Sequence, residues 1–134
     1  MEFDVKWLSG FFDGEGSIGV YARNSDKKKT IKYFVLVVSL AQSGNIGKII
    51  VEKLKEVFGG TVYINKSSRG KVQWKWNISA DKAVVFLEYV LPHLQIKGVE
   101  ATLALDFQEL NNKRFDNDLA TQYANQIKQC KVNY

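Results

Sequence analysis

The stretch Trp7-Leu8-Ser9-Gly10-Phe11-Phe12-Asp13-Gly14-Glu15-Gly16 decides how the rest of the chain is arranged. Its leucine and phenylalanines recur at helical spacing, which predicts a helix that buries one apolar stripe. A second face, formed by Ser9, Gly10 and Gly14, carries almost no side chain. Because a glycine inside a helix costs about 1 kcal/mol relative to alanine, two glycines four residues apart favour a compensating close contact with another helix.

Two acidic residues, Asp13 and Glu15, lie in the last turn of this predicted helix. The negative end of a helix dipole disfavours carboxylates there by roughly 0.5 kcal/mol, so we expect positive charge beside them. A strand follows directly, because residues 17–23 alternate between an apolar and a more polar face.

Residues 8–16, followed by Ser17-Ile18, resemble the signature of the LAGLIDADG homing endonucleases. Ser9 stands for the first alanine of that signature, Gly14 for the second, and Glu15 for the second aspartate. Two acids at a glycine-rich helix end would ordinarily indicate a turn with a solvated acid, but the whole nonamer in register before a strand favours the family. The resemblance covers residues 5 to about 110, and the tail from Asn111 matches only in kind, as peripheral helices.

Length and composition are consistent with one domain over residues 1–134, with a core at 1–110 and a peripheral helical tail at 111–134. The net charge of +5 suits a polyanionic partner, although many basic proteins bind no nucleic acid. Cys130 is the single cysteine, which excludes an internal disulfide or a cysteine zinc site. Neither a signal-peptide layout nor an apolar run of the ~20 residues needed to cross a bilayer is present, so we expect a soluble intracellular protein, in the cytoplasm or an organelle, with no membrane partner.

Hydrophobic periodicity predicts an α+β fold in which helix, strand and strand repeat and further helices follow. The expected strands are residues 17–23, 31–41, 61–66 and 71–78, and the expected later helices are 46–58, 79–91, 96–110 and a last piece after 117. The two groups of side chains expected in the core are Ile46, Ile49, Ile50, Leu54, Val57 and Phe58 on the helix, and Val62, Ile64, Val72, Trp74, Trp76 and Ile78 on the strands. In the family this order gives an αββαββα domain, whose four-stranded antiparallel saddle-shaped sheet is covered on one face by helices.

The opposite face of the predicted sheet carries side chains that can donate to or accept from base edges. Exposed strands also favour tyrosine and glutamine for propensity alone, so a plain solvated sheet is the alternative. The resemblance implies that this face lies in the DNA major groove, and that Lys27, Lys28 and Lys29 touch the phosphate backbone; the alternative for these lysines is a solvated hairpin tip. The expected base-contacting residues are Tyr21, Arg23, Ser39, Tyr63, Asn65, Gln73, Lys75 and Asn77.

Only one signature helix is present, whereas single-chain members of the family carry two. The resemblance therefore implies a homodimer around a two-fold axis on a near-palindromic duplex. The interface would include Leu8, Ser9, Gly10, Phe11, Asp13 and Gly14.

Pairing would bring two copies of Glu15 together at the centre of the DNA face, where their charges repel unless a cation lies between them. Carboxylates, water and phosphate oxygens are the hard ligands that Mg²⁺ prefers, and Mn²⁺ or Ca²⁺ can occupy such a site. Metal ions between attacking and leaving oxygens explain hydrolysis without a covalent intermediate. His93 is the only histidine, which excludes a His pair, and we expect it to pack or face water beside Pro92, so that no Ser-His-Asp set competes. We also expect no small-molecule cofactor.

Two further catalytic positions follow from the resemblance. Gln42 matches the polar residue that orients water near the metal, although it could equally be a turn residue. Lys97 matches the basic residue near the scissile phosphate, where it would polarise water or stabilise developing charge, and its alternative is a surface lysine at a helix start. Asp13 is interpreted as a buried structural acid at the helix pair. The longer side chain of Glu15, compared with aspartate, keeps the ligand chemistry.

Together these patterns predict a homodimeric, Mg²⁺-dependent, site-specific endonuclease that cuts both strands of a long, pseudo-palindromic DNA site. An RNA-splicing maturase or a non-cleaving DNA-binding regulator on the same scaffold is the alternative. A structural dimer without a nucleic-acid partner is a third hypothesis.

Overall fold

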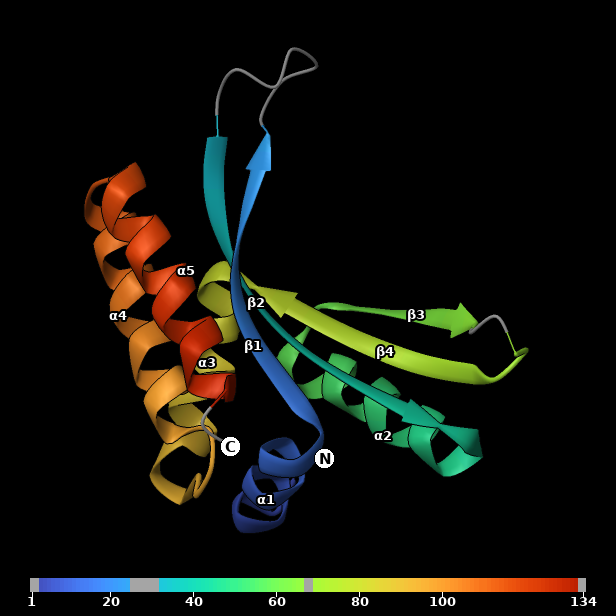
Figure 1. Cartoon of the computed structure of the whole chain (residues 1–134). Helices are drawn as coiled ribbons and strands as arrows, with labels where there is room; N and C mark the ends of the chain where they lie inside the picture. Colours follow the sequence, from blue (N-terminus) through green and yellow to red (C-terminus); the bar gives the residue numbers. More distant parts are fainter. Residues whose placement is uncertain (1–2, 25–31, 67–68, 133–134) are drawn as a thin grey trace.

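The structure, a computed structural model, describes residues 3–24, 32–66 and 69–132 (Figure 1). The first half contains α1 (Val5–Glu15), β1 (Gly16–Asn24), β2 (Lys32–Ser43) and α2 (Gly44–Phe58). The second half contains β3 (Thr61–Lys66), β4 (Val72–Ser79), α3 (Ala80–Val90), the 3-10 turn η1 (Leu91–His93), α4 (Gly98–Lys113) and α5 (Asn117–Val132). The predicted α+β class and the repeated helix–strand–strand order are confirmed.

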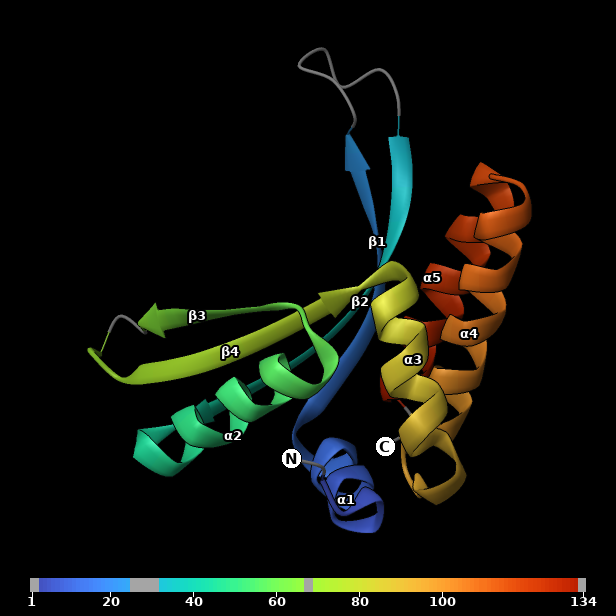
Figure 2. The same cartoon turned by 180° about the vertical axis from the view of Figure 1, so that it is seen from behind.

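The four strands form one antiparallel sheet in the order β1-β2-β4-β3. One straight row crosses all four strands, because Ser17 pairs with Ser39, Ser39 with Asn77, and Asn77 with Thr61. Figures 1 and 2 show that the β1–β2 hairpin and the β3–β4 hairpin diverge, and that the helices gather on one side of the sheet. The other side of the sheet is left as an open, concave face.

An aromatic cluster joins α1 to the sheet. Phe12 packs edge-on against Phe86 of α3 at 5.0 Å between ring centroids, and Phe86 packs against Trp76 of β4 at 5.2 Å. The indole N–H of Trp76 donates to the carbonyl oxygen of Gly59 at 2.9 Å, so this buried polar atom is satisfied. The cluster fixes the orientation of α1 against β4 and α3.

Some side chains that were expected in the core are exposed, on the β3–β4 hairpin and on α2. Ile64 and Val72, near the tip of the β3–β4 hairpin, are 50% and 37% exposed, because the tip extends beyond the helices that cover the rest of the sheet. On α2 the buried residues are Gly47, Val51 and Leu54.

The orientation of α2 has a local cause. A side chain at Gly47 would lie 2.7 Å from Cβ of Gln42, so the glycine lets the first turn of α2 approach β2 closely. Ile46 and Ile49 are consequently turned outward and are 76% and 63% exposed. Both had been expected in the core.

The last two helices run side by side at one edge of the sheet (Figures 1 and 2). The expected polar break at 111–117 is shorter than predicted, since α4 continues to Lys113. α5 then begins at a carboxylate cap, where Asp116 accepts from the backbone N–H groups of Asp118 and Leu119 at 3.0 and 3.1 Å. Ala120, Ala124 and Ile127 are its buried residues. Among the described residues, no helix is long and apolar enough to cross a membrane.

Candidate functional site

The signature helix α1 has one side committed to its own chain. Asp4 caps its start by accepting from the N–H groups of Lys6 and Trp7 at 2.9 and 3.1 Å. Leu8 and Ser9 are fully buried, and the Ser9 hydroxyl lies 2.7 Å from the carbonyl oxygen of Val5 and 3.1 Å from that of Val90 in α3. Leu8 and Ser9, both predicted at a dimer interface, therefore have no exposed surface in the single chain.

The open side of α1 is formed by its glycines. Gly10 and Gly14 are exposed, and a Cβ built on either would meet no atom within 4 Å. Phe11 is half-buried beside them. Trp7, whose place on this face was not predicted, is 48% exposed and stacks on Phe11 at 4.9 Å between ring centroids. Its position three residues before Gly10 and seven before Gly14 is the signal that could have identified it.

Asp13 turns inward and holds the segment that precedes α4. Its carboxylate accepts from the backbone N–H groups of Gln95 (2.6 Å), Ile96 (3.1 Å) and Lys97 (3.0 Å). The Lys97 ammonium donates in return to the carbonyl oxygen of Asp13 at 2.6 Å. Asp13 was predicted to be a buried acid at a pair of helices from two chains. It is buried, and these three hydrogen bonds of its carboxylate lie within its own chain. The positive charge expected at the end of α1 is Lys97, which is 6% exposed and is not a surface lysine.

Glu15 ends α1 with an exposed side chain, two residues after the carbonyl group that binds Lys97. The turn into β1 is tight, since a side chain at Gly16 would overlap the ring of Phe12. Gly16 pairs with Leu40, so Gln42 lies two residues further along β2, at the same end of the sheet as Glu15.

Gln42 was expected just after the second strand, but it lies inside β2 and pairs with Trp74. Its amide donates to the carbonyl oxygen of Ala41 at 2.8 Å. The alternative of a turn residue is therefore excluded, while this side chain is engaged with its own backbone in the present conformation.

The open face of the sheet carries most of the predicted base-contacting residues in cross-strand rows. Lys75 pairs with Tyr63, and Gln73 pairs with Asn65. Ser39 pairs with Asn77. Tyr21 and Arg23 continue this face along β1, where the Arg23 guanidinium lies 5.3 Å from the Tyr21 ring centroid. Lys27, Lys28 and Lys29 lie outside the described residues.

A hollow lies on this face between the two hairpins. Its lining includes Arg23 and Asn77, which were predicted, and residues that were not, among them Val35, Val37 and Lys82. The two valines were not predicted because β2 is apolar at almost every position, so its sequence does not indicate which side chains face outward. Lys82 was not predicted because it belongs to the first turn of α3 and not to a strand. The hollow therefore combines cationic, amide and methyl groups, the three kinds of group that contact phosphates and base edges.

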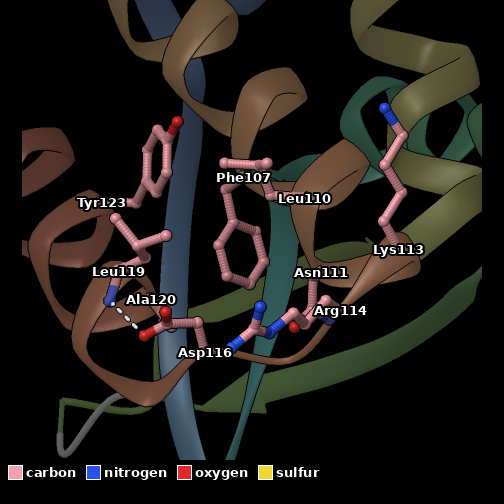
Figure 3. Close-up of a pocket in the computed structure, with 9 residues that line it drawn as sticks. All are labelled: Phe107, Leu110, Asn111, Lys113, Arg114, Asp116, Leu119, Ala120 and Tyr123. Carbon is pink, nitrogen blue, oxygen red and sulfur yellow. Dashed lines mark hydrogen bonds between the residues drawn. The ribbon is translucent and has the colours of Figure 1, made fainter.

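A second hollow lies between α4 and α5 (Figure 3). Phe107, Leu119 and Tyr123 form its apolar part, and Lys113 and Arg114 lie at its rim. These residues belong to the end of α4 far from the segment that Asp13 holds, so this hollow is separate from the Glu15 corner.

The described part of a single chain offers few side chains that could bind a metal ion together. In residues 3–24, 32–66 and 69–132, no group of three or more His, Cys, Asp or Glu side chains is gathered closely enough to hold an ion. Glu15 therefore offers one exposed carboxylate per chain at the end of α1.

The protein has a concave antiparallel sheet backed by helices, and a glycine-faced helix that ends in an exposed acid. This α+β architecture is the fold of the LAGLIDADG homing endonucleases. The family profile described as "LAGLIDADG endonuclease" matches residues 8–112, and the chain belongs to this family of DNA endonucleases.

Two relatives and one solved structure illustrate the similarity. The intron-encoded DNA endonuclease ai2b of Dictyostelium discoideum is 32% identical over 88 residues, which are 65% of this chain and 30% of that protein. The intron-encoded RNA maturase bI4 of Saccharomyces cerevisiae is 34% identical over 74 residues, 55% of this chain and 10% of that protein. The chain thus spans less than a third of either relative. The homing endonuclease I-CvuI, in complex with the I-CreI target, has the same fold with a TM-score of 0.76 and 22% identity, covering 94% of this chain and 80% of that chain.

Proposed function

We propose that the protein is a homodimeric, site-specific endonuclease that hydrolyses both strands of a long pseudo-palindromic DNA site with the help of divalent cations. The observation that carries the proposal is the corner at the end of α1. There the Asp13 carboxylate binds three successive backbone N–H groups of residues 95–97, and the Lys97 ammonium returns to the Asp13 carbonyl. This arrangement holds a cation at the end of α1, two residues before Glu15, where it can stabilise negative charge that develops on a phosphate.

Homodimerisation is supported by the open side of α1. Gly10 and Gly14 give a helix surface on which another backbone can pack closely, and Trp7 and Phe11 supply apolar area at its edge. The chain contains one signature helix and covers 80% of the I-CvuI chain, so the two have comparable lengths. A two-fold axis along these glycines would bring the two copies of Glu15 together.

The donor chemistry fits a divalent cation when two chains are combined. Each chain contributes the exposed Glu15 carboxylate, and Gln42 at the same end of the sheet offers an amide oxygen for a bound water. Oxygen donors of this kind suit Mg²⁺, Mn²⁺ or Ca²⁺. When bound, such ions supply Lewis-acid stabilisation of the phosphate oxygens. I-CvuI has been crystallised with DNA in the presence of magnesium and of calcium, which supports the choice of cation.

DNA recognition is assigned to the concave face of the sheet. Paired side chains there, such as Gln73 with Asn65 and Ser39 with Asn77, offer donors and acceptors at the spacing of neighbouring strands. Arg23 and Lys82 add positive charge for phosphates or guanine. The three lysines at positions 27–29 extend this assignment to the DNA backbone.

The replacement Glu15→Gln tests the proposal. It removes the carboxylate charge but keeps the shape, so double-strand cleavage of randomised duplexes in Mg²⁺ should be abolished while duplex binding in the absence of metal is retained. Glu52→Gln, on the exposed side of α2, is the matched control and should cleave as the unmodified protein does. Cleavage by the Glu15→Gln protein would refute the assignment.

A second candidate, an RNA-splicing maturase, is favoured by the identity to the bI4 maturase. A maturase would bind intron RNA and promote its splicing while leaving the duplex library uncut. Splicing and cleavage are measured with the same protein preparation. Spliced RNA would indicate a maturase, and cut DNA duplexes would indicate a nuclease.

A further inference from the structure

Glu100 is a buried acid outside the predicted site residues. It lies in the first turn of α4, is 1% exposed, and has no hydrogen-bond partner for either carboxylate oxygen among the described residues. A buried carboxylate is costly unless it is compensated by nearby charge or hydrogen bonds. The position of Glu100 therefore requires a physical explanation.

Two lysines provide nearby charge. Lys97 lies three residues before Glu100, and Lys131 lies in the last turn of α5. The first turn of α4 and the last turn of α5 are at the same end of the helix pair, on the side of α1 (Figures 1 and 2). Burial raises the pKa of Glu100 above its ordinary value, and attraction to Lys131 and to Lys97 opposes that rise.

Other titratable side chains on neighbouring elements are placed differently. Glu88 of α3 is exposed and lines a surface hollow with Leu105 and Gln108, which lie further along α4. His93 of η1 is half-buried. β1 and β2 contribute apolar core residues on the side of the sheet that the helices cover.

We propose that Glu100 is a positioning residue for Lys97, and that Lys131 supports it from α5. The buried negative charge of Glu100 attracts the Lys97 ammonium and restrains it at the Asp13 carbonyl, two residues before Glu15. α5 is thereby linked electrostatically to the corner at the end of α1. The inference rests on the proposed nuclease function, because it assigns Lys97 to the reaction.

The proposal has a consequence with a defined sign. Protonation of Glu100 removes its attraction for Lys97, so cleavage should decline on the acidic side of the pH profile. Lys131→Met removes a cation that favours the ionised carboxylate, so this decline should move to higher pH. Glu100→Gln keeps the shape without the charge, and the contribution of this carboxyl group to the acidic decline should disappear.

The test is a set of pH profiles of single-turnover cleavage, measured on a duplex that the unmodified full-length chain cleaves. The proteins are Glu100→Gln, Lys131→Met and the double variant, with Glu109→Gln and Lys128→Met as exposed controls on the same helices. Glu100→Gln should lower the maximal rate roughly tenfold to a hundredfold with DNA affinity unchanged. Lys131→Met should shift the acidic decline upward, and the shift should vanish in the double variant. A shift that persists in the double variant, or a Glu100→Gln profile equal to the original, would overturn the proposal.

A readout without cleavage separates this inference from the nuclease assignment. The ¹³C signal of the Glu100 side-chain carboxyl, assigned by its loss in Glu100→Gln, should titrate at higher pH in Lys131→Met and be unchanged in Lys128→Met. No response to Lys131→Met would refute the electrostatic link alone. The expected response, in a protein that cleaves no duplex, would refute the role of Lys97 in a reaction and therefore the positioning role of Glu100.

Discussion

The two carboxylates in the last turn of α1 lie in different surroundings. Asp13 faces inward and binds the backbone of a segment more than eighty residues away, whereas Glu15 faces solvent. The sequence supports the distinction between the two acids through their alternation. It does not identify the partners of Asp13, because the N–H groups of residues 95–97 carry no sequence signature and approach only when the chain has folded.

Asp13→Asn should weaken both the fold and cleavage. An amide cannot accept the three N–H bonds as well as a carboxylate does, and its own N–H group would face other donors, so we expect a loss of about 1–3 kcal/mol in the free energy of unfolding. Urea unfolding measures this loss. Asp106→Asn, on the exposed side of α4, is the control and should change stability little. Equal stability of the two variants would contradict the structural role of Asp13.

Glu100 should make stability depend on pH with a sign opposite to that of a salt-bridged acid. Its pKa is raised in the folded protein by burial, so the folded state binds the proton more tightly than the unfolded state does. The stability due to this group is therefore greatest at low pH and is lost as pH rises from the ordinary pKa near 4.5 through the raised folded value. The difference in urea midpoint between the unmodified protein and Glu100→Gln, followed from pH 4 upward, checks this sign. A difference that does not vary with pH would contradict it.

At the scale of elements, periodicity predicted which helices and strands exist better than it predicted what covers them. The pattern over 46–58 indicates a helix correctly, yet Ile46 and Ile49 are exposed because Gly47 sets the approach of α2 to β2. Likewise the alternation at Ile64 and Val72 continues past the point where the helices stop covering the sheet. A stripe of apolar residues indicates a face that can be buried, whereas its actual burial depends on the reach of neighbouring elements.

The open side of α1 can be tested by filling it. Gly10→Leu should leave the single chain folded or slightly more stable, because the added side chain meets no atom nearby and a helical glycine is unfavourable. The same side chain should separate two paired α1 helices, so sedimentation should report lone chains and cleavage should be lost. Asn125→Leu adds an equal apolar group on the exposed side of α5 and should leave assembly intact. A dimeric, active Gly10→Leu protein would exclude pairing through this face.

At the scale of the whole molecule, the two faces of the sheet differ in what covers them. The helices bury the core against one face of the sheet, and the other face remains open between diverging hairpins (Figures 1 and 2). α1 lies at the end of the sheet where β1 begins, so its open side and the exposed Glu15 lie near the open face of the sheet. A second copy packed on α1, as proposed, would extend the open face across the two-fold axis, as recognition of a long site by a chain of 134 residues requires.

Salt dependence should distinguish the open face from the remainder of this basic surface. Lys82 lines the hollow between the hairpins, whereas Lys128 lies on the exposed side of α5. If Lys82 contacts a phosphate, Lys82→Gln should reduce the slope of log binding constant against log salt concentration by about 0.9 per half-site, and weaken binding to all duplex sequences alike. Lys128→Gln should leave the slope unchanged, because a lysine on α5 that contacts no phosphate releases no counterions from the DNA. Binding titrations of both variants in Ca²⁺, at several salt concentrations, measure the two slopes; a larger effect at Lys128 would assign DNA to the helical side of the molecule.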